Sequence, residues 1–321
     1  MYKPLINKER GNAMKLRILV AVAIFSAGLI ASESDNPGRG KKPDKDKPVP
    51  ATDVVLVKKL TSKGRPASPG GGKPAKGSTA TGVLGQQVTG NRYAVVIGIS
   101  DYPGTVNDLQ YCDDDAEAMS TALGVYGFTG VTVLENSSAT RGEILAAIEG
   151  LVSQVGSDDE VVFFFSGHGA NGVASDGDDE RIDEAIVVCN NENTGLTYIW
   201  DGELRDAFSD FATSRIIFIF DSCLAGGMQQ DLQGPGRVIA MAAGEKGYSY
   251  ETDALQNGEF TYYFVEEGIL GGKANIHDYN GDGETQQPAQ VTVEEAFDYC
   301  KSNCKLDKPC VGDYFGEDLL P

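Results

Sequence analysis

Two side chains suited to nucleophilic catalysis each follow an apolar run that predicts a buried strand. His168 is the third residue after Val161–Phe165, and Cys223 is the third residue after Ile216–Phe220. A cysteine attacks a carbonyl as its thiolate, and a neighbouring imidazole can take the thiol proton. The only other histidine, His277, does not follow such a run. His168 and Cys223 are therefore the predicted catalytic pair, although each alone also fits a turn histidine or a small buried hydrophobe.

Alternating strand and helix patterns supply the frame for these two side chains. Apolar, β-rich runs predict strands over 93–99, 131–134, 161–165, 185–188, 216–220 and 238–241. Helical patterns lie over 113–126, 140–151, 201–209, 260–267 and 292–300. This alternation indicates an α/β fold with a mostly parallel central sheet and helices on both faces. Function gathers where loops leave the carboxyl ends of such strands, so the two side chains are expected to meet there.

Charge divides the chain into a basic first part and an acidic body. The 321 residues have a net charge of −20, which combines +10 over residues 1–90 with −30 over residues 91–321. With 41% hydrophobic residues the chain is long enough for one large domain with tails. An acidic body repels phosphate backbones and attracts cations and basic peptides, so nucleic acid is excluded as a partner.

The first part contains a predicted leader and a predicted linker. Residues 1–32 read as a signal peptide, with Ile18–Ile30 as its apolar run and Met14 as an alternative start. The run is shorter than the roughly 20 residues that span a bilayer, so we expect export, with a retained N-terminal anchor as the alternative. Residues 33–90, rich in Pro, Gly, Lys and Ser, predict a disordered basic linker or propeptide. Its basic residues, such as Lys63 or Arg65, are candidates to lie across an acidic site and be cut, whereas a plain tether is the alternative.

Several motifs of the body occur in an order typical of one family. Tyr93–Ser100, Ser166–Gly169, Asp178–Ile186 and Asp221–Gly227 together resemble the caspase-like cysteine peptidases, in particular their metacaspase-type branch. The likeness continues through Gly258–Tyr263 and covers most of the body. The caspase signature Gln-Ala-Cys-x-Gly is absent, because Asp-Ser precedes the cysteine. The resemblance implies a caspase-like fold for residues 91–321.

The resemblance also implies peptide-bond hydrolysis by a His–Cys dyad. Cys223 would attack the scissile carbonyl to form an acyl-enzyme, and His168 would take the thiol proton and later protonate the leaving amine. Backbone N–H groups near Gly169 and Cys223 would stabilise the oxyanion. The chemistry itself requires no cofactor.

Specificity for Arg or Lys before the scissile bond follows from the same resemblance. The matching pocket positions are Cys112, Asp115, Ser166 and Asp221. Two carboxylates converging there would pair with a guanidinium or ammonium and reject an acidic side chain. Without the resemblance, Asp113–Asp115 also fit ordinary acids at a helix N-terminus, and Asp221 fits a carboxylate that accepts loop N–H groups.

Calcium is the cation that the resemblance suggests as an activator. Its ligands would map to Asp183 and Asp201, with Asp231 as a further candidate. Gly202 stands where the family often has a second adjacent Asp, and a solvated acidic loop is the alternative. Asp278–Gly283 carries half of an EF-loop pattern and fits a metal-free turn equally well.

The remaining cysteines are candidates for disulfides in an oxidising compartment. Cys300, Cys304 and Cys310 could supply one disulfide, with Cys189 as a further partner, whereas a zinc site is not expected from their irregular spacing. The predicted function is thus an exported cysteine endopeptidase acting on Arg/Lys peptides. Two alternatives stay open: a catalytically idle binding module of the same fold, and a related thiol peptidase directed at Asn.

Overall fold

The computed structural model describes residues 43–63, 79–177, 180–284 and 287–321, all within the compact unit Gly40–Pro321. The predicted leader, residues 1–32, lies outside the described residues, as do Arg65 and part of the predicted linker. Among the described residues, the search for helices long and apolar enough to cross a bilayer finds none.

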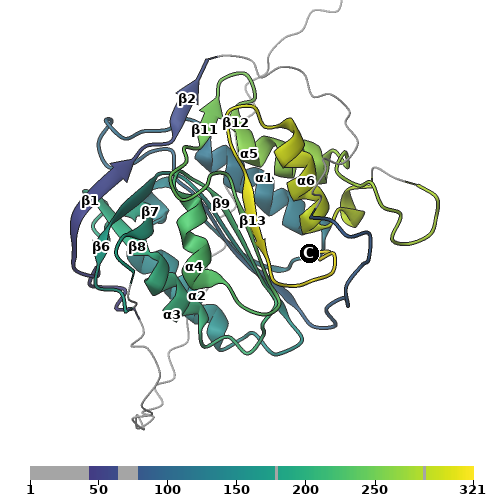
Figure 1. Ribbon diagram of the computed structural model, residues 1–321. Helices are drawn as coiled ribbons and strands as arrows, with labels where there is room; N and C mark the ends of the chain where they lie inside the picture. Colours follow the sequence, from purple (N-terminus) through teal and green to yellow (C-terminus); the bar gives the residue numbers. More distant parts are fainter. Residues whose placement is uncertain (1–42, 64–78, 178–179, 285–286) are drawn as a thin grey trace, which may run out of the picture. The chain divides into compact units, whose positions relative to one another are not determined.

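A six-stranded, mostly parallel sheet forms the centre of the unit (Figure 1). Its strands pair in the order β13-β10-β9-β5-β3-β4, and only the edge strand β13 is antiparallel to its neighbour. Their bounds are β3 Arg92–Gly98, β4 Gly130–Glu135, β5 Glu160–Ser166, β9 Ile216–Asp221, β10 Arg237–Met241 and β13 Cys310–Asp313. The near-continuous apolar runs of β5 and β9 suit strands that are covered on both faces.

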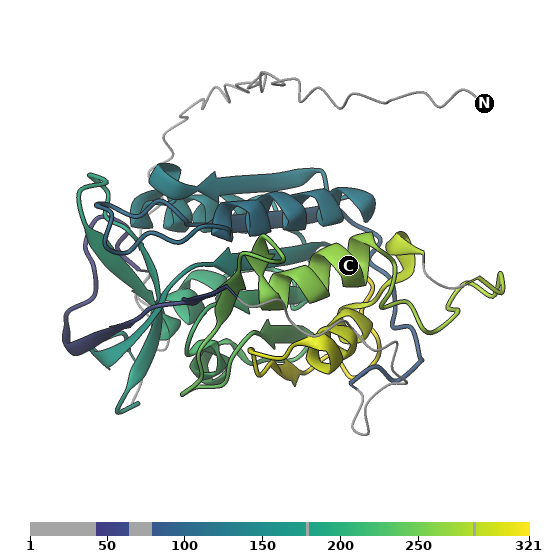
Figure 2. The same cartoon turned by 90° about the horizontal axis from the view of Figure 1, so that it is seen from above.

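Helices cover both faces of this sheet (Figure 2). They are α1 Cys112–Val125, α2 Arg141–Val152, α3 Asp201–Phe208, α4 Gln229–Leu232, α5 Glu259–Thr261 with the following π-helix Tyr262–Leu270, and α6 Val293–Asn303. Single 3-10 turns lie at Asn136–Ser138, Ala225–Met228 and Pro288–Gln290. Alternate side chains of β5 divide between two cores: Phe163 packs with α2 and α3, and Phe164 packs with α1 and α6. The predicted α/β architecture, a mostly parallel central sheet with helices on both faces, is confirmed.

Two smaller sheets include segments that sequence alone placed elsewhere. One is antiparallel, in the order β1-β6-β7-β8, with β1 Ala51–Val57, β6 Gly169–Ala174, β7 Asp183–Cys189 and β8 Leu196–Trp200. The other joins β2 Leu60–Ser62, β11 Tyr250–Thr252 and β12 Asn257–Gly258. The strand expected over 185–188 therefore exists, but it lies in an antiparallel sheet outside the central one.

The expectation of a disordered linker over residues 33–90 needs correction where the structure describes that segment. β1 pairs with β6 and β2 pairs with β11, so part of the segment belongs to the folded unit. A short apolar cluster with few neighbours of its own becomes ordered because β6 supplies the backbone partners and part of the core that the local composition lacks.

Candidate active site

The parallel register of two central strands brings the predicted catalytic residues to one sheet edge. Ser166 at the end of β5 pairs with Asp221 at the end of β9, so His168 and Cys223 each lie two residues beyond that pair. Both side chains are 1% exposed. The edge between these strand ends is therefore a buried site with a thiol and an imidazole.

Contacts from a neighbouring loop fix the orientation of the His168 ring. The ring stacks on Tyr102, with centroids 4.9 Å apart and planes inclined by 19°. The Tyr102 hydroxyl accepts a hydrogen bond from the His168 backbone N–H (3.0 Å) and donates one to the Val187 carbonyl (3.1 Å). Nε2 lies 2.8 Å from the Asn107 carbonyl oxygen, which makes Nε2 the protonated nitrogen and leaves Nδ1 as an acceptor. Sequence reasoning missed Tyr102 and Asn107 because no motif marks their loop.

Cys223 lies on a tight turn next to the start of β6. Its sulfur accepts a hydrogen bond from the Ser249 backbone N–H at 3.2 Å, and Leu224 after it adopts a left-handed φ of 62°. A Cβ at Gly169 would lie 2.1 Å from the Cys223 carbonyl oxygen, so only glycine permits this approach. The two backbone segments predicted to bind the oxyanion are thus in contact.

Both groups of the pair are in their uncharged forms at neutral pH. Burial raises the pKa of the Cys223 thiol to about 11. Burial, with the nearby charges of Lys58 and Lys59, lowers the pKa of His168 to about 4. Among the described residues, no hydrogen bond joins the sulfur to the ring, because both are engaged by residues of the N-terminal segment.

The predicted pocket residues surround a lysine of the chain itself. The Lys59 ammonium lies 2.8 Å from Asp221 Oδ1, 3.5 Å from Asp115 Oδ2 and 3.1 Å from Ser166 Oγ. Cys112 Sγ is 3.8 Å from the same nitrogen. Both carboxylate side chains and that of Lys59 are fully buried. The four positions therefore form one acidic, water-excluding pocket.

Neighbouring groups hold the two carboxylates toward the ammonium. Asp221 accepts hydrogen bonds from the hydroxyls of Ser249 (2.6 Å) and Thr261 (2.7 Å). Burial raises the pKa of Asp115 to about 7, although Lys59 acts in the opposite direction. Burial alone would lower the pKa of Lys59, but Asp221 and its neighbours outweigh this and raise it well above the usual value. An empty pocket would therefore bury two converging acids with no counter-charge.

The residue in the pocket differs from those that sequence favoured. Lys63 is exposed and follows β2, so it lies beyond the pocket. Arg237, a further basic residue, donates to the Leu232 carbonyl, and its guanidinium lies over the Phe218 ring. All of these residues are basic. Lys59 is the one in the pocket because it lies between β1 and β2, which pass on either side of the site.

A second acidic group lies away from the pocket. Carboxylate oxygens of Asp176, Asp201 and Asp231 lie within 4.8 Å of one another. Asp183, paired with Asp201 by sequence, accepts a hydrogen bond from the Ala174 backbone N–H (2.7 Å) and is not part of this group of three. Of the two metal ligands predicted from sequence, only Asp201 therefore belongs to this group.

Asp176 fills the space next to the glycine that departs from the family pattern. A Cβ at Gly202 would lie 2.7 Å from Asp176 Cγ, so this carboxylate occupies the volume that a side chain at position 202 would enter. Burial, followed by Asp231 and Asp176, raises the pKa of Asp201 to about 9. Arg205 offsets part of the charge, since its Nη1 lies 3.0 Å from Asp231 Oδ2. Oxygen ligands alone and concentrated negative charge suit a hard divalent cation.

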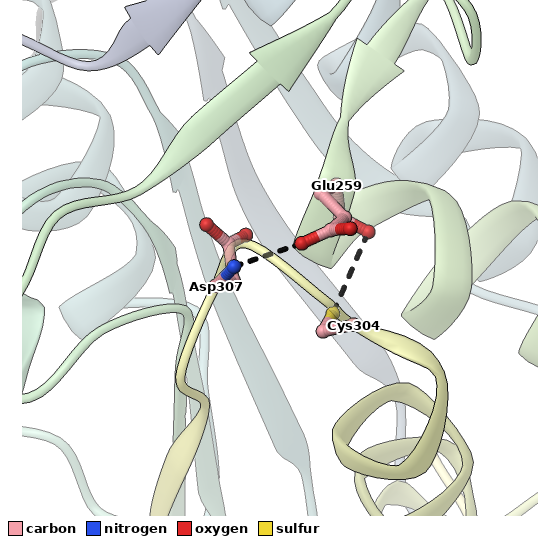
Figure 3. A group of neighbouring side chains, drawn as sticks. All are labelled: Glu259, Cys304 and Asp307. Atoms are coloured by element: carbon pink, nitrogen blue, oxygen red, sulfur yellow. Dashed lines mark hydrogen bonds between the residues drawn. The ribbon is translucent and has the colours of Figure 1, made fainter. Parts of the chain in front are cut away.

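A third cluster consists of Glu259, Cys304 and Asp307 (Figure 3). Hydrogen bonds from the protein backbone engage both of its carboxylates. Glu259 accepts from the backbone N–H groups of Lys305, Leu306 and Asp307, and Asp307 accepts from those of Tyr250 and Phe260. These bonds tie the loop after α6 to β11 and α5, beside the pocket. The cluster is thus structural.

The structure contains none of the disulfides that the sequence allowed for an oxidising compartment. All six cysteines are free thiols, and the sulfurs of Cys300 and Cys304 lie 3.5 Å apart.

The second histidine and the turn after it lie away from the pocket. His277 Nδ1 is hydrogen-bonded to Glu295 Oε1 at 3.0 Å. Asp278 accepts hydrogen bonds from the backbone N–H groups of Gly281 and Gly283, an arrangement that fits both interpretations that the sequence left open.

A thiol and an imidazole at adjacent ends of parallel strands, next to an acidic pocket, define a class of α/β proteins with the parts for acyl transfer. The chain matches the family model of the caspase domain over residues 91–298, and it belongs to that family. The resemblance expected from its motifs is confirmed.

Metacaspases are among the curated relatives of the chain. Metacaspase-4 of Arabidopsis thaliana is 37% identical over 146 residues, which cover 42% of this chain and 34% of that protein. Metacaspase-1 of Schizosaccharomyces pombe is 33% identical over 150 residues, which cover 43% and 35%. The chain thus spans about a third of the length of these relatives. The solved structure of protein GSU0716 from Geobacter sulfurreducens shares the fold, with a TM-score of 0.52, 18% identity and coverage of 70% of this chain and 93% of that one.

Proposed function

We propose that the protein is a cysteine endopeptidase that hydrolyses peptide bonds after Lys or Arg. The observation that carries this proposal is the buried Lys59 ammonium between Asp221 and Asp115, next to Cys223 and His168. Two carboxylates in a water-excluding pocket select a cation strongly, because any other occupant leaves them uncompensated.

Each catalytic group has one task in this mechanism. His168 Nδ1, free of a proton because Nε2 donates to Asn107, takes the Cys223 proton. The thiolate attacks the carbonyl of the residue in the pocket, and the same nitrogen then protonates the leaving amine. Water hydrolyses the acyl-enzyme in a second round of the same proton transfers. Backbone N–H groups of Gly169 and Cys223 are proposed to stabilise the oxyanion.

The two alternative functions predict different products. An Asn-directed peptidase would place a neutral amide between two acids, which is a poor match for this pocket. An idle binding module would bind basic peptides and leave them intact. Hydrolysis of fluorogenic peptides ending in Arg, Lys, Asn or Asp separates these functions, with Cys223→Ala as the control. Cleavage after Arg and Lys supports the proposal, whereas cleavage after Asn or Asp overturns it.

We also propose that Asp176, Asp201 and Asp231 bind calcium. The three converging carboxylates fit a hard cation, which would add to the positive charge that Arg205 supplies at Asp231. Trp200, the only tryptophan, is adjacent to Asp201 and reports on binding without an activity assay. Calcium titration should change its fluorescence, and Asp201→Asn or Asp176→Asn should abolish the change. An unchanged signal together with no calorimetric heat would contradict this assignment.

We propose export from residues 1–32, whose basic and apolar parts match a signal peptide. The test is N-terminal sequencing of the protein recovered from an exporting host. Processing near residue 32 supports export, and an intact N-terminus in the cytosol contradicts it.

A further inference from the structure

The peptide bond that lies at the catalytic pair is the one before the pocket residue. The Cys223 thiol donates to the Lys58 carbonyl oxygen at 3.3 Å, and the Lys59 backbone N–H donates to His168 Nδ1 at 3.0 Å. Both groups therefore face the Lys58–Lys59 bond. In that bond the residue that fills the pocket is on the amine side.

A substrate with a basic residue in this pocket must be arranged the other way round. The carbonyl that Cys223 attacks then belongs to the pocket residue itself, so the chain after that residue passes the catalytic pair. The chain before the pocket residue must leave on the opposite side, along β11. In this protein the chain before Lys59 passes the catalytic pair and the chain after it follows β11.

Strand pairing shows the same reversed direction independently. β2 runs parallel to β11, with Leu60 opposite Tyr250, Thr61 opposite Glu251 and Ser62 opposite Thr252. The Leu60 N–H donates to the Ser249 carbonyl at 3.0 Å. A substrate arranged as above would run antiparallel to β11, so β2 occupies the substrate groove with the opposite polarity.

The segment is also anchored on the far side of the catalytic pair. β1 is antiparallel to β6, and Val57 pairs with Gly169 next to His168. The Lys58 ammonium donates to the Val106 carbonyl at 2.7 Å, outside the acidic pocket. Anchors on both sides hold the segment in place while it occupies the thiol and the imidazole.

We propose that residues Lys58–Ser62, here called the strap, are a built-in inhibitor that binds the substrate groove in reverse and is not cleaved there. The Lys59 ammonium pairs with the two pocket carboxylates as a basic substrate side chain would. The bond at the catalytic pair has Lys58 on its acyl side, and the Lys58 side chain lies outside the pocket, on the Val106 carbonyl. The thiol proton is directed at the carbonyl oxygen of the same residue. This inference rests on the proposed function and concerns the regulation of the same site.

The first experiment compares full-length variants on an Arg fluorogenic peptide. Lys59→Ala should raise kcat/KM by about tenfold or more, because activity scales with the fraction of molecules whose site is open. Lys63→Ala, an exposed basic residue just after β2, is the matched control and should leave activity unchanged. Mass spectrometry of the purified wild type should show the bonds on both sides of Lys59 intact. Cleavage after Lys59 would overturn the proposal.

The second experiment tests directly in which chain direction the strap binds the groove. It uses added peptides, so the result does not depend on the position of the strap within the Lys59→Ala variant. A peptide with the sequence of residues 51–63 is added to Lys59→Ala enzyme, beside a peptide of the same residues in reversed order. The native peptide should inhibit and stay intact. The reversed peptide presents Ser-Thr-Leu-Lys in the substrate direction and should be cut after that lysine. Cutting of the native peptide after Lys59 at a similar rate would contradict reverse binding.

These outcomes separate the strap from the catalytic assignment. If Lys59→Ala and wild type hydrolyse Arg peptides equally, the strap proposal fails and the proposed function stands. If neither variant hydrolyses any basic peptide, including the reversed one, the proposed function fails.

Discussion

Asp221 and Asp115 contribute unequally to the contact with the Lys59 ammonium. Asp221 lies 2.8 Å from the Lys59 ammonium, whereas Asp115 lies at 3.5 Å and has its pKa raised to about 7 by burial. The closer carboxylate therefore forms the stronger, charge-assisted hydrogen bond. Asp115 adds a second negative charge, but a smaller fraction of this carboxyl is ionised when no cation is in the pocket, because the Lys59 charge lowers its pKa.

Neutralising the closer acid should harm activity most. In a Lys59→Ala background, Asp221→Asn should lower kcat/KM on Arg peptides by about 30-fold or more, because a buried charge pair is broken. Asp115→Asn should have a smaller effect. Asp114→Asn, exposed on the same helical turn, is the control. Equal losses in the Asp221 and Asp115 variants would contradict this ranking.

The thiol of Cys223 should be unreactive in the wild type at neutral pH. Its pKa is raised to about 11 by burial, and thiolate is the form that alkylates. Labelling by iodoacetamide, mapped by mass spectrometry, should increase about tenfold per pH unit between pH 7 and 9. Lys59→Ala should label faster at pH 7.5, since the strap no longer covers the sulfur. Identical rates in the two proteins would show that the strap does not shield it.

Motif order was enough to predict His168 and Cys223 as a pair, because both follow strands whose apolar runs are unmistakable. Lys59 was not predicted, because Lys63 and Arg65 are as basic and the choice depends on three-dimensional distances. Tyr102 and Asn107 act on His168 through loop geometry, which leaves no sequence pattern.

Strand pairing and the Lys59 side chain both hold the strap in the groove. β1 forms an edge on β6, and Val55 faces solvent with 56% exposure. Composition predicted a linker here because Pro, Gly and Lys dominate its surroundings, whereas pairing with β6 was invisible in the local sequence. The central strands were predictable because their signal is local and strong, but the assignment of β7 to a separate sheet was not.

Weakening β1 should therefore activate the enzyme without touching the pocket. Val55→Pro in full-length protein should raise activity on Arg peptides toward the level of Lys59→Ala, because proline fixes φ and removes a backbone N–H that strand pairing can use. Val55→Ser preserves the backbone N–H and is the control. The comparison of initial rates at matched concentration checks this, and an inactive but folded Val55→Pro would contradict it.

At the scale of the whole molecule, the burial of carboxyl groups makes stability depend on pH. Burial raises the pKa of Glu160 at the start of β5 to about 7, although Arg92 and Arg215 act against it. Between its usual pKa of 4.5 and about 7 the folded chain holds a proton that the unfolded chain releases. The stabilising contribution of this neutral carboxyl is therefore complete below pH 4.5 and is lost as the pH rises through 7.

Glu160→Gln keeps a neutral side chain at every pH. Its Tm should exceed that of the wild type by about 2–4 °C at pH 8 and match it at pH 4.5. The exposed Glu149→Gln should show no such difference. A Tm gain that is the same at both pH values would show that the Glu160 charge is not its cause.

The most direct test of the central claim is product analysis of the open enzyme. Lys59→Ala protein is incubated with otherwise identical peptides that carry Arg, Lys, Asn or Asp before a single reporter bond, beside the Lys59→Ala/Cys223→Ala double variant. The account predicts cleavage after Arg and Lys only, and none in the double variant. Cleavage after Asn or Asp, or turnover that persists without Cys223, would contradict it.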